Sequence, residues 1–170
     1  MKIWNSVQNL GYHLRERKHK ENFQIALTSG FFAPLTKGHV RLIEESSKYG
    51  ELVVVINGDN ALCKKKGFIP QFAEERAEII SKLETVDYVV IYDYDDVSGA
   101  ILSVQADYFC KGGDEYLSEQ DINPRELFAC KEVGAVIKFT TGGNKKIASS
   151  SDIFNRHLDY LIKNGYKKDT

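Results

Sequence analysis

The chain is predicted to fold as one α/β domain built on a doubly wound, Rossmann-like parallel sheet. Short runs rich in β-branched and aromatic residues alternate with stretches of helical periodicity, and parallel strands need such crossover connections. A length of 170 residues with 42% hydrophobic composition is sufficient for one well-filled core. These observations predict a five-stranded parallel sheet covered by helices, with an additional N-terminal helix.

Residues 1–22 are expected to form a helical extension in front of the main domain, residues 23–170. An apolar stripe at helical spacing predicts that this extension packs on the domain or on a second subunit; its members are Ile3, Val7, Leu10 and Leu14. Five runs with strand composition follow, at 23–28, 52–56, 88–92, 108–110 and 135–139.

Five helical stretches are expected between and after these strands. Gly50 ends the first of them, while Asn123 and Pro124 provide a cap and a first turn for the fourth, which Gly134 ends. The stretches are 38–49, 72–83 with an apolar face of Phe72, Ile79, Ile80 and Leu83, 97–104, 123–134, and a last one that begins in Ser149, Ser150 and Ser151.

The charge and the cysteines narrow the class of protein. A net charge of -1 provides no basic field for nucleic acid, and no apolar run resembles a membrane span or a secretory leader. Cys63, Cys110 and Cys130 form no close pair, which disfavours a zinc site and is typical of free thiols in a reducing cytoplasm. Cys110 and Cys130 are expected in the core, and Cys63 in an exposed polar loop.

The most informative segment is the turn from Gly30 to His39, which leaves the first strand and enters a helix. Gly30 and Gly38 allow the backbone to approach a ligand, and the unpaired amides of the helix start face an anion. Thr36 and His39 can donate hydrogen bonds to phosphate oxygens, and a protonated imidazole would add charge. The alternative is that the glycines only shape a turn and that His39 is an ordinary helix-start histidine.

Glycines and polar residues also follow other strands. The carboxyl ends of parallel strands share one edge of the sheet, where ligands bind in open α/β folds. Four of these ends combine glycine with lysine, histidine or hydroxyl groups, which suits a polyphosphate ligand. The segments are 30–39, 57–67 with lysines at 64–66, 111–114, and 140–146 leading into the serines.

This ordered set of motifs resembles the cytidylyltransferase-like nucleotidyltransferases. The signature of that family is a glycine-aromatic turn ending in His-x-Gly-His or Thr-x-Gly-His, with a serine- or threonine-rich helix start near the C-terminus. The matching segments here are 36–39 and 147–151, and the resemblance covers about 23–155. The segment 111–114, Lys-Gly-Gly-Asp, is more similar to the heptose 1-phosphate adenylyltransferase domain of ADP-heptose synthesis than to glycerol 3-phosphate cytidylyltransferases.

Three positions depart from the family pattern. Ala33 stands where most members have aspartate or asparagine, and Thr36 replaces the first histidine, as in the pantetheine-phosphate branch. Residues 141–146 replace the Arg-Thr-Glu-Gly run of the glycerol 3-phosphate enzymes. The resemblance implies a cytoplasmic, homodimeric enzyme that transfers a nucleoside monophosphate from ATP or CTP to a sugar or polyol phosphate. Mg²⁺ is expected to accompany the triphosphate, with no metal bound by the protein alone.

The resemblance also implies roles for individual residues. Thr36, His39 and Lys66 would act on the phosphates in the transfer step, with Lys66 in a loop that closes over them. The acceptor would be held by Asn57, Asp59 and Arg76. The nucleotide would be held by Gly30, Phe31, Phe32, Gly38, Lys111, Gly113, Asp114, Ser149, Ser150 and Ser151.

Other functions remain open on the sequence alone. Ala33 is compatible with a module that binds a nucleotide without turning it over, and a glycerol 3-phosphate-type cytidylyltransferase is the second choice among enzymes. A dinucleotide-dependent oxidoreductase is disfavoured, because no Gly-x-Gly-x-x-Gly follows the first strand.

Overall fold

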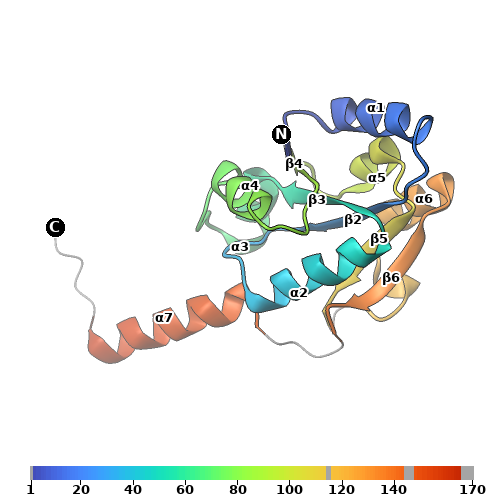
Figure 1. Cartoon of the computed structure of the whole chain (residues 1–170). Coiled ribbons are helices and arrows are strands. Elements are labelled where there is room, and N and C mark those ends of the chain that lie inside the picture. Colours follow the sequence, from blue (N-terminus) through green and yellow to red (C-terminus); the bar gives the residue numbers. More distant parts are fainter. Residues whose placement is uncertain (1, 114–115, 144–147, 166–170) are drawn as a thin grey trace.

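One parallel sheet lies between two layers of helices (Figure 1). The computed structural model describes residues 2–113, 116–143 and 148–165. Its strands are β1 Ile3–Trp4, β2 Ile25–Gly30, β3 Glu51–Asn57, β4 Tyr88–Tyr92, β5 Tyr108–Gly112 and β6 Val136–Thr141. Its helices are α1 Val7–Lys18, α2 Lys37–Ser46, α3 Asp59–Lys66, α4 Ala73–Ser81, α5 Ser98–Val104, α6 Pro124–Val133 and α7 Ser150–Asn164, with short 3₁₀ turns at Ser47–Tyr49 and Glu119–Asp121.

The sheet has six strands in the order β1-β4-β3-β2-β5-β6, and every pairing is parallel. The prediction of five strands is therefore wrong by one. The additional strand, β1, pairs with β4 through Ile3 and Trp4. A strand of two residues is too short to show alternation in a sequence. The predicted apolar stripe therefore assigns Ile3 to the N-terminal helix. That helix begins at Val7, after the Ser6 cap.

Both faces of the sheet are covered because its central strands are apolar on both sides. Five consecutive residues of β3 are buried, and they alternate between two core clusters. Helices α1, α5 and α6 pack on one face, and α2 and α4 pack on the other (Figure 1). This arrangement is the doubly wound fold that the sequence predicts.

Helix α1 is firmly packed on the rest of the chain. Val7, Leu10 and Leu14 are buried in the cluster that α5 and α6 share, as their helical spacing predicts. A Cβ atom at Gly11 would lie 2.1 Å from the carbonyl oxygen of Ser103, so a glycine is required for α1 and α5 to approach this closely.

Two predicted features of the helices are wrong. Residues 64–66 form the last turn of α3 and not a loop, and Gly67, with a φ of 78°, ends that helix. The second predicted helix corresponds to α4, where Phe72 and Ile79 are 60% and 41% exposed and Arg76 is 1% exposed. Apolar periodicity could not reveal a buried stripe that contains an arginine; its members are Ala73, Arg76, Ala77, Ile80 and Ser81.

Other local predictions are confirmed. The Asn123 side chain accepts a hydrogen bond from the backbone N–H of Arg125, and Gly134 ends α6 with a φ of 71°. Cys110 and Cys130 are buried and Cys63 is exposed, although Cys63 lies on α3. Helix α7 extends away from the sheet (Figure 1). Within the described ranges, no helix combines the length and the apolar character needed to cross a membrane.

Candidate functional site

A cavity of about 760 Å³ lies at the carboxyl ends of β2 and β5. The chain reverses the strand order there, since β3 and β4 lie on one side of β2 while β5 lies on the other. Open α/β sheets bind ligands at such a switch point. The predicted site residues that line this cavity are Gly30, Phe31, Phe32, His39, Asn57 and Lys111. Residues for which the sequence predicts no ligand role also line it, among them Asp95, Tyr116, Asp121, Asn123 and Glu126.

His39 reaches this cavity from the first turn of α2. The backbone N–H of Thr36 donates to Nδ1 of His39 at 3.1 Å, and the Thr36 side chain in turn accepts from the backbone N–H of His39. A ring nitrogen that accepts a hydrogen bond carries no proton, so the proton of the neutral ring is on Nε2. The cap of α2 thus selects the tautomer in which His39 is a donor through Nε2.

The surroundings of His39 favour the neutral form of its ring. Burial, and then the positive charge of Lys66, lower the pKa of His39 from 6.5 to about 4. In the chain without a ligand, the His39 imidazole therefore carries no positive charge at neutral pH. The edge of the Phe32 ring, 5.2 Å away between centroids, contributes to this apolar surrounding. His39 is a neutral hydrogen-bond donor, a form that needs no proton uptake in order to contact a phosphate oxygen.

The lowered pKa of His39 has a consequence for stability. Between about pH 6.5 and about pH 4 the unfolded chain binds a proton that native His39 excludes, so the free energy of unfolding should fall as the pH falls. Above pH 6.5 both states are neutral and this contribution vanishes. His39→Asn has no such group. The difference in the free energy of unfolding between this variant and the wild type should therefore shift in favour of the variant by about 1 to 2 kcal/mol from neutral pH to pH 5. Urea unfolding of both proteins across this range measures the difference, and parallel profiles would contradict the pKa shift.

The N-terminus of α7 lies beside the N-terminus of α2. The Thr36 hydroxyl donates to the carbonyl of Ala148 at 3.4 Å, and the Ser150 hydroxyl donates to the carbonyl of Pro34 at 2.9 Å. A Cβ atom at Gly38 would lie 3.0 Å from the Ala148 carbonyl oxygen, so this contact favours glycine. Two positive helix ends meet here, and the first-turn amides of a helix have no partner within the helix itself, as an anion-binding site requires.

The serines at the start of α7 are partly engaged within the protein. Ser149 and Asp152 form a reciprocal cap, in which the Ser149 backbone N–H donates to the Asp152 carboxylate at 2.9 Å and the Ser149 hydroxyl accepts from the Asp152 backbone. The Ser150 hydroxyl donates to Pro34 in the turn before α2, and Ser151 is exposed. Backbone amides, more than the first two hydroxyls, are therefore the groups that this end offers to a ligand.

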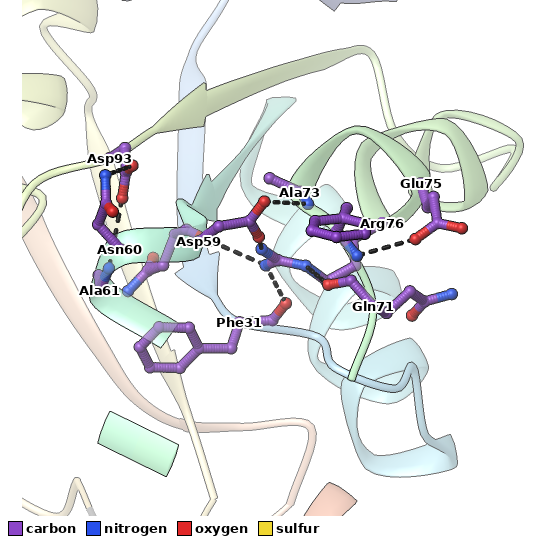
Figure 2. A network of polar contacts seen from close by, with 11 residues as sticks. Phe31, Asp59, Asn60, Ala61, Gln71, Ala73, Glu75, Arg76 and Asp93 are labelled. Carbon is purple, nitrogen blue, oxygen red and sulfur yellow. Dashed lines mark hydrogen bonds and ion pairs between the residues drawn. The ribbon is translucent and has the colours of Figure 1, made fainter. Parts of the chain in front are cut away.

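The Arg76 side chain connects the turn that follows β2 with three neighbouring segments through hydrogen bonds (Figure 2). Its side chain is fully buried, and Nη1 donates to the carbonyls of Phe31 and Asn57 at 2.7 and 2.8 Å. Nη2 donates to the Asp59 carboxylate at 2.6 Å, and Nε donates to the Gln71 carbonyl at 3.0 Å. Arg76 is thus buried and is not a residue of the cavity wall, and its geometry is that of a positioning group.

The lysines of α3 lie on two sides of the helix, toward the cavity and toward α7. Lys64 and Lys65 line the cavity, with the Lys64 amine 2.6 Å from the Asp95 carboxylate. Lys66 lies toward α7, with its amine 5.3 Å from the centre of the Phe154 ring. Burial, and then the charge of Lys65, lower the pKa of Lys66. Positive charge therefore borders His39 on the side of α3.

The remaining residues that the sequence analysis singled out differ in their burial and in their contact with the cavity. Asn57 lines the cavity, and its Oδ1 is buried with no hydrogen-bond partner among the described residues. Asp59 is held by the buried arginine and by the first backbone amide of α4. Ala33 is fully buried within the turn, and Gly113 follows β5 with a φ of 86°. Asp114 lies outside the described residues.

A family model described as cytidylyltransferase-like matches residues 27–156. Among curated proteins, the bifunctional protein HldE of Hyphomonas neptunium is 37% identical over 102 residues, which is 58% of this chain and 21% of that protein. The bifunctional protein HldE of Citrobacter koseri is 33% identical over 141 residues, or 78% of this chain and 29% of that protein. The chain therefore spans between about a fifth and three tenths of the length of these relatives.

Two solved structures share the fold. The lipopolysaccharide core biosynthesis protein from Thermoplasma volcanium superimposes with a TM-score of 0.55 and 26% identity, covering 69% of this chain and 94% of that one. The pantoate-β-alanine ligase from Francisella tularensis also reaches 0.55, with 99% of this chain and 80% of that one covered, but at 13% identity this likeness concerns the fold alone.

Proposed function

Because the chain belongs to the cytidylyltransferase-like family of nucleotidyltransferases, we propose that it transfers a nucleoside monophosphate from ATP or CTP to a sugar or polyol phosphate. The observation that carries the proposal is the neutral Nε2 donor of His39 beside two helix N-termini at the switch point. In the transfer, an acceptor phosphate oxygen bonds to the α-phosphorus, the bond from that phosphorus to the bridging oxygen breaks, and pyrophosphate leaves with the electron pair.

This reaction depends on positioning and on neutralising charge, because no covalent intermediate with the protein is needed. His39 would donate to an oxygen on the α-phosphorus as negative charge develops there. Lys66 and the first-turn amides of α2 and α7 would hold the leaving phosphates, while Thr36 fixes the His39 ring as a positioning residue. Gly30, Phe31, Phe32, Gly38, Gly113 and Asp114, together with the serines at 149–151, stay proposed contacts of the nucleotide.

Magnesium belongs to this proposal as part of the substrate. Within residues 2–113, 116–143 and 148–165, no three His, Cys, Asp or Glu side chains are grouped so that they could hold a metal ion. Mg²⁺ commonly binds through substrate phosphates with few protein ligands, and we propose that it enters as the magnesium complex of the triphosphate. A cytoplasmic location and a homodimer complete the proposal.

A sugar 1-phosphate of the heptose type is the acceptor that we propose to test first. The curated relatives are HldE proteins, and the Thermoplasma relative is described as a lipopolysaccharide core biosynthesis protein. Glycerol 3-phosphate is the second choice, because the motif of the enzymes that use it is absent from 141–146.

Pyrophosphate release tests this function. ATP and CTP are each supplied with Mg²⁺ and, in turn, with heptose 1-phosphate, glycerol 3-phosphate and simpler sugar phosphates. Release that requires one triphosphate and one acceptor is the expected result. Triphosphate binding without release in any combination would instead identify a nucleotide-binding module, and Ala33 would then be the first position to change. If no triphosphate binds, the proposed site itself is wrong.

A further inference from the structure

Lys111 and Glu126 form a buried ion pair in the wall of the cavity. The Lys111 amine, at the end of β5, is 2.8 Å from the Glu126 carboxylate in the first turn of α6, and the two side chains are 9% and 8% exposed. Removing two charges from water costs several kcal/mol each, so a buried pair is weak evidence for a role in stability. Its place in the wall of a cavity points to a role toward a ligand.

With respect to the residues that the structure describes, both members of the pair have hydrogen-bonding capacity left for a ligand. The Lys111 amine also lies over the faces of the Phe109 and Tyr116 rings, at 4.7 and 4.9 Å from the ring centres. An ammonium group has three N–H donors, and the carboxylate takes one of them. Glu126 accepts from the backbone N–H of Val97 at 3.3 Å and from Lys111, while a carboxylate has about four acceptor sites.

The pair lies on the opposite side of the sheet from the groups proposed to hold the phosphates. His39 belongs to α2 on one face, whereas Glu126 belongs to α6 on the other. In an in-line displacement, the acceptor approaches the α-phosphorus from the side opposite to the leaving pyrophosphate. The part of the cavity wall that the end of β5 and the start of α6 form is therefore where the acceptor should lie, if the proposed transfer is correct.

We propose that Lys111 and Glu126 bind hydroxyl groups of the acceptor and select a polyhydroxylated phosphate ester. This inference rests on the proposed function and moves Lys111 from the nucleotide to the acceptor. A donor and an acceptor side by side match a hydroxyl group, which both donates and accepts, whereas a phosphate would use the donor alone. Asn123 and Tyr116 line the same cavity.

Calorimetry with the whole chain tests this assignment. Heptose 1-phosphate is titrated into protein saturated with a non-hydrolysable triphosphate, and inorganic phosphate is the probe without carbon-bound hydroxyls. The double variant Lys111→Met/Glu126→Leu should fold, since replacing both members of a buried pair by apolar groups is often neutral for stability. We expect it to bind heptose 1-phosphate at least about tenfold more weakly, with triphosphate and inorganic phosphate affinities changed by less than about twofold.

A second variant and a control separate this role from a structural one. Glu126→Gln keeps the shape of the side chain and an acceptor for the Val97 backbone, and it should weaken heptose 1-phosphate binding in the same direction. Arg125→Met, on the same helix but 79% exposed, should leave every affinity unchanged. Unchanged sugar-phosphate affinity in the double variant, or weakened triphosphate affinity, would overturn the proposal, as would a wild-type chain that binds no heptose 1-phosphate.

The two proposals can fail separately. If the wild type shows no pyrophosphate release but the variants lose sugar-phosphate binding, the transfer function is wrong and the hydroxyl site stands. If release occurs and the double variant keeps the wild-type KM for the acceptor, the function stands and the hydroxyl site is wrong.

Discussion

Replacing His39 by asparagine should lower kcat by on the order of 100- to 1000-fold while leaving the fold intact. The loss corresponds to about 2 to 4 kcal/mol, which is typical for removing one hydrogen-bond donor from a developing negative charge. The side-chain oxygen of the introduced asparagine can take the place of Nδ1 and accept from the Thr36 backbone, so the cap of α2 is kept. Steady-state pyrophosphate release and urea unfolding at neutral pH measure the two effects.

Two further variants make the His39 result specific. His39→Gln carries an amide N–H at about the position of Nε2 and loses the cap acceptor, so it should recover part of kcat and be less stable than His39→Asn. His157→Asn changes an exposed histidine of α7 and should alter neither quantity. A rate for His39→Asn within about threefold of wild type would exclude His39 from the transfer step.

Replacing Arg76 by methionine should lower the free energy of unfolding by about 3 kcal/mol or more. Methionine fills a similar volume but removes the donor of the Phe31, Asn57 and Gln71 carbonyls, and it leaves the Asp59 carboxylate with the Ala73 backbone N–H alone. Breaking a buried ion pair on one side typically costs about 3 to 5 kcal/mol, and the partial exposure of Asp59 places the expected loss near the lower end. Urea unfolding gives the value directly.

Controls distinguish this positioning role from contact with the acceptor. Arg125→Met removes an exposed arginine that lies 3.6 Å from the Asp96 carboxylate, and it should change stability by less than about 0.5 kcal/mol. Arg76→Lys should not restore stability, because one ammonium cannot reach acceptors on four separate segments. If Arg76→Lys were as stable as wild type and changed only the KM for the acceptor, Arg76 would be a substrate ligand after all.

Much of the fold, and the cavity that several predicted site residues share, could be predicted because their signals are local. The apolar runs of β3 and the stripe of α1 report burial within a few residues, and the caps at Asn123 and Ser149 are set by adjacent backbone groups. The turn that holds His39 follows its strand directly in the sequence. Because parallel strands end at one edge, strand order along the chain is enough to gather these segments at one place. The chemical roles of the gathered residues remain predictions.

What the sequence by itself determined is therefore the layered α/β architecture and the gathering of glycine, histidine and lysine residues at one sheet edge. The tertiary structure decided the sixth strand, the neutral His39, the internal position of Arg76 and the pairing of Lys111 with Glu126. Each of these depends on the order of strands in the sheet. That order brings side chains from distant parts of the chain within about 3 Å of one another. A charged residue looks the same in a sequence whether it is solvated or paired in the core, so its partner, and with it its function, appears only in the folded protein.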